Sequence, residues 1–329
     1  MSEPAAPCCN VCQAPLQAGD RFCEQCGARV HDDEPQAGGC EACGAGPSAI
    51  GTDGYCFVCG VRSPSGPDRI EVDLMIAAAV SDRGRVHRRN EDSFHVEVVG
   101  ERSVVVVVCD GISSASAGNV AARRAADAAA TVLAHAIADP AHDASTATVD
   151  AIQAANGAVE QVPWTTRTER VDPSCTLVSA VCRAGEIVVG WVGDSRAYWV
   201  DTDGSRQLTV DDSFAEEGIA KGLLTAEQAT RSPFVHSVTH WVGPDAPERP
   251  PRLSVLRPDR QGRLVLCTDG LWNYVATASE LAELIGALPA GAAPAAVARA
   301  LTDTAVVRGG RDNITVAVVD VDPSGGGSK

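Results

Sequence analysis

The chain has 329 residues, a formal net charge of −16 and a hydrophobic content of 45%. That length accommodates one large domain and a smaller appendage, and the apolar content is enough for a sizeable core. A strongly acidic surface repels nucleic acids and anionic membranes, so we expect neither as a main partner. The longest run of strong hydrophobes, Val104–Val108, is far shorter than the about 20 residues of a membrane-spanning helix. Residues 1–16 lack the features of a secretory signal, so we expect a soluble cytoplasmic protein.

The N-terminal cysteines occur in CxxC pairs, and two such pairs make up each of two copies of one pattern. Each CxxC turn presents two thiolates, and two turns complete a tetrahedral, structural Zn²⁺ site with no open position. The two copies resemble a double zinc ribbon that binds two Zn²⁺ ions. Each copy is too short to bury a stable core, so the bound ion would stabilise its fold. The eight expected ligands are Cys9, Cys12, Cys23, Cys26, Cys40, Cys43, Cys56 and Cys59. Cys8 is left over, and a pairing of Cys8 with Cys12 is an alternative.

Composition predicts four segments along the chain. They are a double zinc ribbon at 1–62, a Pro- and Gly-rich linker at 63–69, a main domain at 70–322 and a flexible Gly-Ser tail at 323–329. Because the ribbon segment is acidic, we expect it to bind a protein partner rather than nucleic acid. The remaining cysteines lie in apolar segments, where we expect small buried side chains: Cys109, Cys175, Cys182 and Cys267.

Within the main domain, hydrophobic patterning predicts strands, then two helices, more strands, a polar insertion, strands, two helices and a last strand. The expected strands are 72–80, 94–99, 103–109, 175–182, 186–192, 196–200, 252–256, 263–267 and 313–321. The expected helices are 117–138, 145–161, 278–287 and 293–305. This order predicts the α+β class, with two sheets and helices outside them.

Four aspartates lie at the ends of the expected strands. Asp110, Asp194 and Asp269 each follow an apolar run, and Asp312 comes just before the last one. A carboxylate at a strand end is held by a rigid sheet but still reaches solvent, and Mg²⁺ and Mn²⁺ prefer such oxygen ligands. Aspartate is also common where strands turn into loops. Four in these positions, two of them followed by glycine, nevertheless favour a metal site.

Six short motifs occur in a fixed order between about residues 74 and 320. They are Gly84–Phe94, Cys109–Gly111, Ser174–Thr176, Gly193–Arg196, Thr268–Trp272 and Gly310–Thr315. Each motif alone is weak, but six in this order are specific, and together they resemble the metal-dependent Ser/Thr protein phosphatases of type 2C. The resemblance implies a central β-sandwich of two antiparallel sheets flanked by helices (α-β-β-α). It also implies hydrolysis of phosphoserine and phosphothreonine in phosphorylated proteins.

The resemblance further implies a centre of two Mn²⁺ or Mg²⁺ ions. Asp110 would bridge both ions, the Gly111 carbonyl would ligate one, and Asp269 and Asp312 would complete the other. Glu91 and Asp92 would act from nearby, largely through waters on the metals. Two such ions lower the pKa of a shared water, which attacks phosphorus in line, so no covalent phospho-enzyme is needed.

Three positions depart from the family pattern. His87 stands where the family usually has a phosphate-binding Arg, and Arg88 and Arg89 follow it, so either a protonated His87 or a neighbouring Arg would bind phosphate. Residue 112 is Ile rather than the His of some members. Asn273 replaces an Asp that, with the equivalents of Asp194 and Asp269, holds a third metal, so that candidate site is weakened.

Two further interpretations concern the insertion and a rival function. Residues 211–240, the flap, match the family's variable segment beside the active site, where they would either help to select substrates or form a plain surface loop. The altered phosphate loop is also compatible with a non-catalytic phospho-sensor or scaffold. The retained Asp110, Asp269 and Asp312 favour the enzyme, since a binding module needs no hydrolytic metal centre.

Overall fold

The computed structural model describes residues 45–46, 49, 58, 69–115, 117–139, 141–163, 172–183, 185–230, 234 and 237–323. The expected zinc ligands and residues 324–329 lie outside this part of the chain, so the zinc-ribbon prediction stays a prediction. Contacts divide the chain into two compact units, Met1–Ser65 and Gly66–Lys329. The fold described below is that of the second unit.

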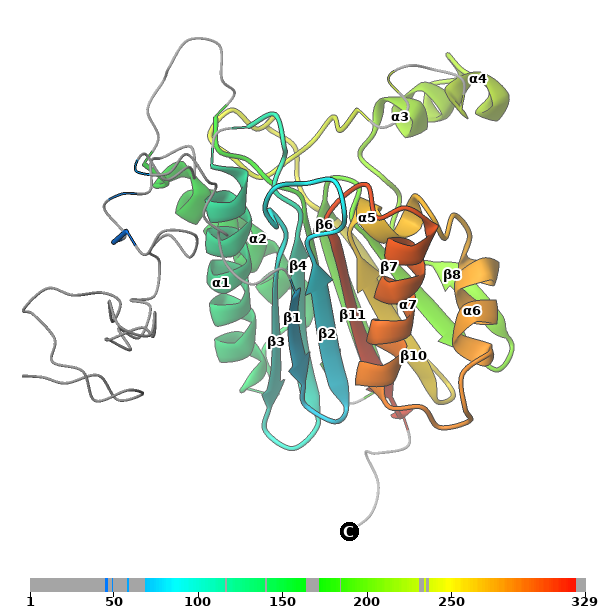
Figure 1. The fold of residues 1–329 in the computed structure, drawn as a ribbon. Coiled ribbons are helices and arrows are strands. Elements are labelled where there is room, and N and C mark those ends of the chain that lie inside the picture. The colour runs from blue at the N-terminus through cyan, green and yellow to red at the C-terminus, as the bar shows by residue number, and fades with distance from the viewer. Residues whose placement is uncertain are drawn as a thin grey trace, which may run out of the picture. The chain divides into compact units, whose positions relative to one another are not determined.

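Two antiparallel sheets form the centre of this unit (Figure 1). The six-stranded sheet has the order β1 (Arg69–Asp73), β2 (Ala77–Asp82), β11 (Ile314–Val321), β10 (Gly262–Cys267), β7 (Arg196–Asp201) and β8 (Gly204–Gln207). The five-stranded sheet has the order β3 (Ser93–Val99), β4 (Ser103–Cys109), β5 (Leu177–Arg183), β6 (Glu186–Val192) and β9 (Arg252–Leu256). A layer of buried side chains from both sheets packs between them.

Helices cover the outer face of each sheet (Figure 1). The five-stranded sheet is covered by α1 (Gly118–Ile137) and α2 (Ala144–Glu160), and the six-stranded sheet by α6 (Ala278–Gly286) and α7 (Pro294–Arg308). The short helices are α3 (Phe214–Ala220), α4 (Ala226–Thr230) and α5 (Asp269–Trp272). The predicted α+β sandwich with flanking helices is therefore confirmed. No helix of the described residues is both long and apolar enough to cross a bilayer.

Strand β4 shows why the sheets pack on both faces. Side chains alternate across a strand, so Val104, Val106 and Val108 enter the layer between the sheets. Val105 and Val107 face the other way and pack under α1 and α2. A run of β-branched residues without polar alternation is typical of such a doubly covered strand.

Helix α2 approaches the five-stranded sheet closely because position 190 of β6 has no side chain. A Cβ atom on Gly190 would lie only 2.2 Å from Cγ2 of Thr148 in α2. The Thr148 hydroxyl donates a hydrogen bond to the Ala144 carbonyl at 2.7 Å, which holds the side chain in place. The buried face of α1 consists mostly of alanine, which allows the same close packing.

Three local expectations are corrected or extended, and one is confirmed. The run 72–80 is two strands rather than one, because β1 and β2 form an antiparallel pair. The turn between them places exposed Met75 at φ 68°, and its N–H donates to Asp73 Oδ1 at 3.0 Å. Strand β8 was not predicted, and the polar insertion contains α3 and α4. The four cysteines of the main domain are free and buried, as predicted.

Close packing at Gly190 leads to a stability prediction. We expect Gly190→Ala to lower the free energy of unfolding by about 1–3 kcal/mol, because the added methyl overpacks the contact with Thr148. In the Gly190→Ala/Thr148→Ser double variant, removal of Cγ2 should restore most of that loss while the hydroxyl bond remains. Chemical denaturation of the four proteins of this cycle measures the coupling.

Gly157→Ala in α2 is the matched control, since nothing lies within 4 Å of the added methyl. It should be neutral or stabilise by up to about 1 kcal/mol. Equal destabilisation by both glycine substitutions, or no coupling between positions 190 and 148, would contradict the packing argument.

Candidate metal centre

Five aspartates meet at one edge of the sandwich. Asp110 and Asp194 follow the ends of β4 and β6, and Asp269 begins α5 just after β10. Asp92 and Asp312 come just before the starts of β3 and β11. Neighbouring antiparallel strands run in opposite directions, so the end of one strand lies beside the start of the next. The sheet topology thereby brings together residues from four distant parts of the chain.

The charges of these aspartates act on one another. Burial raises the pKa of Asp110 well above its ordinary value, and the carboxylates of Asp92, Asp269, Asp312 and Asp194 raise it further. Burial likewise raises the pKa of Asp92 to about 8, although hydrogen bonds from two threonines oppose the shift. The pKa of Asp269 rises to about 6, first through burial and then through Asp312. The cluster thus concentrates negative charge that a cation would stabilise.

Two carboxylate oxygens in the cluster have unmet bonding capacity. Asp92 accepts hydrogen bonds at Oδ2 from Thr268 Oγ1 at 3.0 Å and from Thr315 Oγ1 at 2.7 Å. Among the described residues, its buried Oδ1 and the buried Oδ1 of Asp269 have no hydrogen-bond partner. Buried acceptors are normally bonded, so these two oxygens suit a hard cation or the water that it carries.

The side-chain positions alone do not form a complete metal-coordination site. In the described part of the chain, no three His, Cys, Asp or Glu side chains surround a common point at metal-ligand distances. The donors that the cluster does supply are carboxylate oxygens, which fit Mg²⁺ or Mn²⁺ better than a metal that prefers nitrogen or sulfur.

Backbone contacts hold Asp110 and Gly111 firmly. The Asp110 N–H donates to Thr176 Oγ1 at 3.2 Å, and the Thr176 N–H donates to the Asp110 carbonyl at 2.8 Å. A Cβ atom on Gly111 would lie 2.6 Å from the Gly118 backbone and 2.7 Å from the Glu91 carbonyl oxygen. Only glycine fits at position 111, which brings the loop before β3 close to the end of β4.

Asn313 organises the loop that carries the candidate phosphate-binding residues. Its Oδ1 accepts the Glu91 N–H at 2.7 Å, and its Nδ2 donates to the carbonyls of Arg83 at 2.8 Å and Arg89 at 3.0 Å. This residue belongs to the sixth sequence motif, but its role in shaping a loop more than 200 residues away was not predicted. The only sequence feature that pointed to this role was the position of Asn313 directly after Asp312.

The three candidate phosphate-binding residues lie in different surroundings. His87 Nε2 is 3.2 Å from Asp312 Oδ1. Arg89 Nε is 2.8 Å from Oε1 of Glu91, a buried carboxylate. Arg88 is exposed. His87 and Arg89 thus contact acidic residues of the predicted site.

The candidate third metal site combines helix α5 and the turn after β6. Asn273 Nδ2 donates to Asp269 Oδ2 at 3.2 Å, so the amide uses one oxygen of its neighbour. Asp194 is 5% exposed, and its pKa is raised by burial and by the charge of Asp269. The indole N–H of Trp272 donates to the Asp194 carbonyl at 2.9 Å, which joins α5 to the turn after β6.

The sequence is similar to a known protein family and to characterised bacterial phosphatases. The family model described as "Protein phosphatase 2C" matches residues 83–304. The serine/threonine phosphatase stp of Listeria innocua is 29% identical over 251 residues, covering 73% of this chain and 93% of that protein. The serine/threonine protein phosphatase PstP of Mycobacterium tuberculosis is 32% identical over 252 residues, covering 74% of this chain and 44% of that protein.

Solved structures show the same fold. The phosphatase Stp1 of Staphylococcus aureus aligns with a TM-score of 0.66 at 25% identity, covering 77% of this chain and 98% of that one. The PstP catalytic domain, crystallised in complex with two manganese ions, aligns with a TM-score of 0.59 at 28% identity over 77% of this chain and 99% of that one. Because the family model matches most of the sandwich, the chain belongs to the protein phosphatase 2C family of metal-dependent Ser/Thr protein phosphatases.

Proposed function

We propose that this protein removes phosphate from phosphoserine and phosphothreonine in proteins, using two Mn²⁺ or Mg²⁺ ions held at the aspartate cluster. The observation that carries the proposal is the pair of buried, unbonded carboxylate oxygens of Asp92 and Asp269 within a group of mutually repelling aspartates. Family membership supplies the reaction class. The solved PstP complex with two manganese ions supports the metal.

The chain's own residues have separate tasks in this proposal. Asp110, the Gly111 carbonyl, Asp269 and Asp312 would hold the ions. When bound, such ions would stabilise charge on phosphoryl oxygens and lower the pKa of a water molecule. Asp92 would fix the position of water near the substrate, because Thr268 and Thr315 hold its carboxylate in one orientation.

Asp194, Asp269 and Asn273 form the candidate third metal site. The Asn273 amide is neutral and donates to Asp269. We therefore propose that a third cation binds more weakly than the first two, since one charged ligand is replaced by an amide.

Substrates and partners follow from charge and composition. We propose cytoplasmic phosphoproteins as substrates, because the strongly acidic chain disfavours nucleic acid and anionic membranes. For segment 1–62 we propose two structural Zn²⁺ sites and a protein partner, on the basis of the repeated CxxC spacing and the acidic composition.

Asp110 is the residue on which the two-ion centre is expected to depend most. We expect Asp110→Asn to lower the rate of phosphothreonine-peptide hydrolysis by at least about 100-fold, which corresponds to about 2.7 kcal/mol, because the amide removes a negative charge shared between two cations. The same variant should lose most of the rise in melting temperature that Mn²⁺ gives the wild type. Steady-state kinetics and calorimetric melting measure the two effects.

Asp150→Asn on the exposed face of α2 is the control for Asp110→Asn. It removes the same charge from the chain away from the cluster and should leave both measurements unchanged. Wild-type hydrolysis by Asp110→Asn would show that Asp110 has been assigned wrongly.

A second prediction decides which basic residue binds the substrate phosphate. His87 already faces Asp312 and Arg89 already faces Glu91. A permanent guanidinium is the more dependable phosphate ligand, so we expect Arg88→Ala or Arg89→Ala to raise KM for a phosphopeptide several-fold. His87→Arg should then change KM little at pH 6 and at pH 8.

The opposite pattern would support a protonated His87. In that case KM of the wild type should rise between pH 6 and pH 8, and His87→Arg should abolish the rise. Measuring KM for one phosphopeptide across the four proteins at both pH values separates the two arrangements.

A third prediction concerns the N-terminal segment. Thiolates favour Zn²⁺, whereas a carboxylate cluster holds Mn²⁺ or Mg²⁺ with waters and more weakly. Protein purified under reducing conditions should therefore retain about two Zn per chain after dialysis while losing Mn and Mg. Elemental analysis measures this, and protein without zinc would rule out the double ribbon.

A further inference from the structure

The flap, residues 211–240, leaves and rejoins the sandwich through two adjacent segments. The Thr239 N–H donates to the Asp212 carbonyl at 2.8 Å, and the Phe214 N–H donates to the Ser237 carbonyl at 2.9 Å. We call this paired part, residues 212–214 and 237–239, the stem. Helices α3 and α4 extend from it.

Asp212 lies at the base of the stem and is only 1% exposed. Its Oδ2 accepts the Gly193 N–H at 3.1 Å, and its own N–H donates to the Gly193 carbonyl at 2.9 Å. The side chain and the backbone of one residue therefore bond both polar groups of Gly193. This two-point contact fixes Gly193 relative to the stem more firmly than either bond alone.

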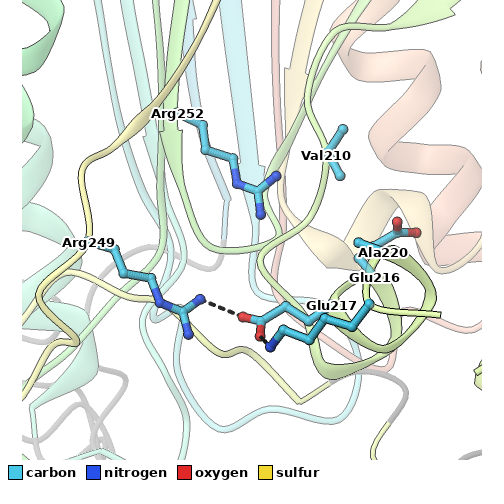
Figure 2. Close-up of a pocket in the computed structure, with 7 residues that line it drawn as sticks. Val210, Glu216, Glu217, Ala220, Arg249 and Arg252 are labelled. Atoms are coloured by element: carbon cyan, nitrogen blue, oxygen red, sulfur yellow. Dashed lines mark hydrogen bonds and ion pairs between the residues drawn. The ribbon is translucent and has the colours of Figure 1, made fainter. Parts of the chain in front are cut away.

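Two basic residues lie beside the buried carboxylate of Asp212, and the guanidinium of Arg252 compensates its charge. Arg252 of strand β9 donates through Nε to Asp212 Oδ1 at 2.8 Å. His240, at the end of the flap, places Nδ1 3.4 Å from Asp212 Oδ2. Figure 2 shows the Arg252 side chain beside a pocket that Glu216 and Ala220 line on the α3 side. Asp212 thus joins the stem, the edge strand β9 and the turn after β6.

Gly193 passes this restraint directly to Asp194. Gly193 has φ +104°, and a Cβ atom there would lie 2.7 Å from the Thr176 side chain, so the turn is confined on its other side as well. Thr176 in turn accepts the Asp110 N–H. A displacement of Gly193 would therefore move Asp194 relative to Asp110 and the rest of the cluster.

We propose that Asp212 is a positioning residue for the metal centre. By bonding Gly193, it links the flap stem to the turn that determines the position of the Asp194 carboxylate. The inference rests on the proposed phosphatase function and assigns Asp212 no contact with substrate or cation. Backbone bonds alone could pair the stem segments, whereas a buried carboxylate has a substantial desolvation cost. Its benefit is the fixed geometry of the Gly193–Asp194 turn, in the way that residues behind metal ligands orient those ligands.

The test compares wild type, Asp212→Asn, Asp212→Ala and Glu217→Gln. Glu217 is a matched control because it lies in the same flap and bonds Arg249, Lys221 and the stem residue Thr239, but not the Gly193 turn. Two measurements are made on each full-length protein. Calorimetric titration gives the Mn²⁺ concentration for half-maximal binding, and steady-state kinetics with a small aryl phosphate gives kcat and KM.

We expect Asp212→Ala to need about tenfold more Mn²⁺ for half-maximal binding and to lose about tenfold or more in kcat. Asp212→Asn should show a smaller change in the same direction, because the amide still accepts the Gly193 N–H but lacks the charge that holds Arg252. KM for the aryl phosphate should stay within about twofold if Asp212 acts on the metal centre rather than on substrate binding. Glu217→Gln should match the wild type in both measurements.

Wild-type Mn²⁺ binding and kcat in both Asp212 variants would overturn the inference, and so would an equal loss in Glu217→Gln. If circular dichroism shows that Asp212→Ala is unfolded, Asp212→Asn alone decides. Failure of the wild type itself to bind Mn²⁺ and hydrolyse the aryl phosphate would instead count against the proposed function.

Discussion

The aspartates at one edge of the sandwich repel one another, and the rest of the domain must hold them close together despite this repulsion. Burial and neighbouring carboxylates both raise the pKa of Asp110, so in the absence of a cation the cluster opposes its own ionisation. A flexible loop would relieve this by separating the charges. Rigid strands prevent the separation, because each aspartate lies at or next to one end of a strand of the packed sandwich. The unfavourable charge density becomes useful once a divalent cation binds.

The sandwich provides that rigidity through three packed layers. One lies between the sheets, and one lies under the helices on each outer face. Hydroxyl and amide groups then fix individual side chains at the edge. Thr315 in β11 and Thr268, just after β10, both donate to Asp92. Asn313 bonds two carbonyls and one N–H of the opposite loop. Such bonds orient a carboxylate without neutralising it, which preserves its attraction for a cation.

The flap contacts this edge through two consecutive aspartates. Asp211 accepts hydrogen bonds from Arg196, whose guanidinium lies 3.9 Å from the ring centre of Trp272 in α5. Asp212 bonds Gly193. Since α5 also begins with Asp269, each flap residue reaches a different carboxylate of the cluster through one or two intermediates. The flap is therefore joined to the metal centre at two points, through Asp211 and through Asp212.

Local sequence determined a large part of this protein. Apolar runs predicted most strands, and the ends of these runs indicated Asp110, Asp194 and Asp269 as candidate metal ligands. Six motifs in a fixed order indicated the family. These features are readable because strand periodicity and motif order are properties of neighbouring residues. Only the tertiary structure brought Asp92 to Thr315, which is 223 residues away in the chain, and His87 to Asp312. It also divided the run 72–80 at a turn and paired the two flap segments at Asp212. Contacts of this kind depend on which strands pair and in which register, and no local pattern encodes that choice.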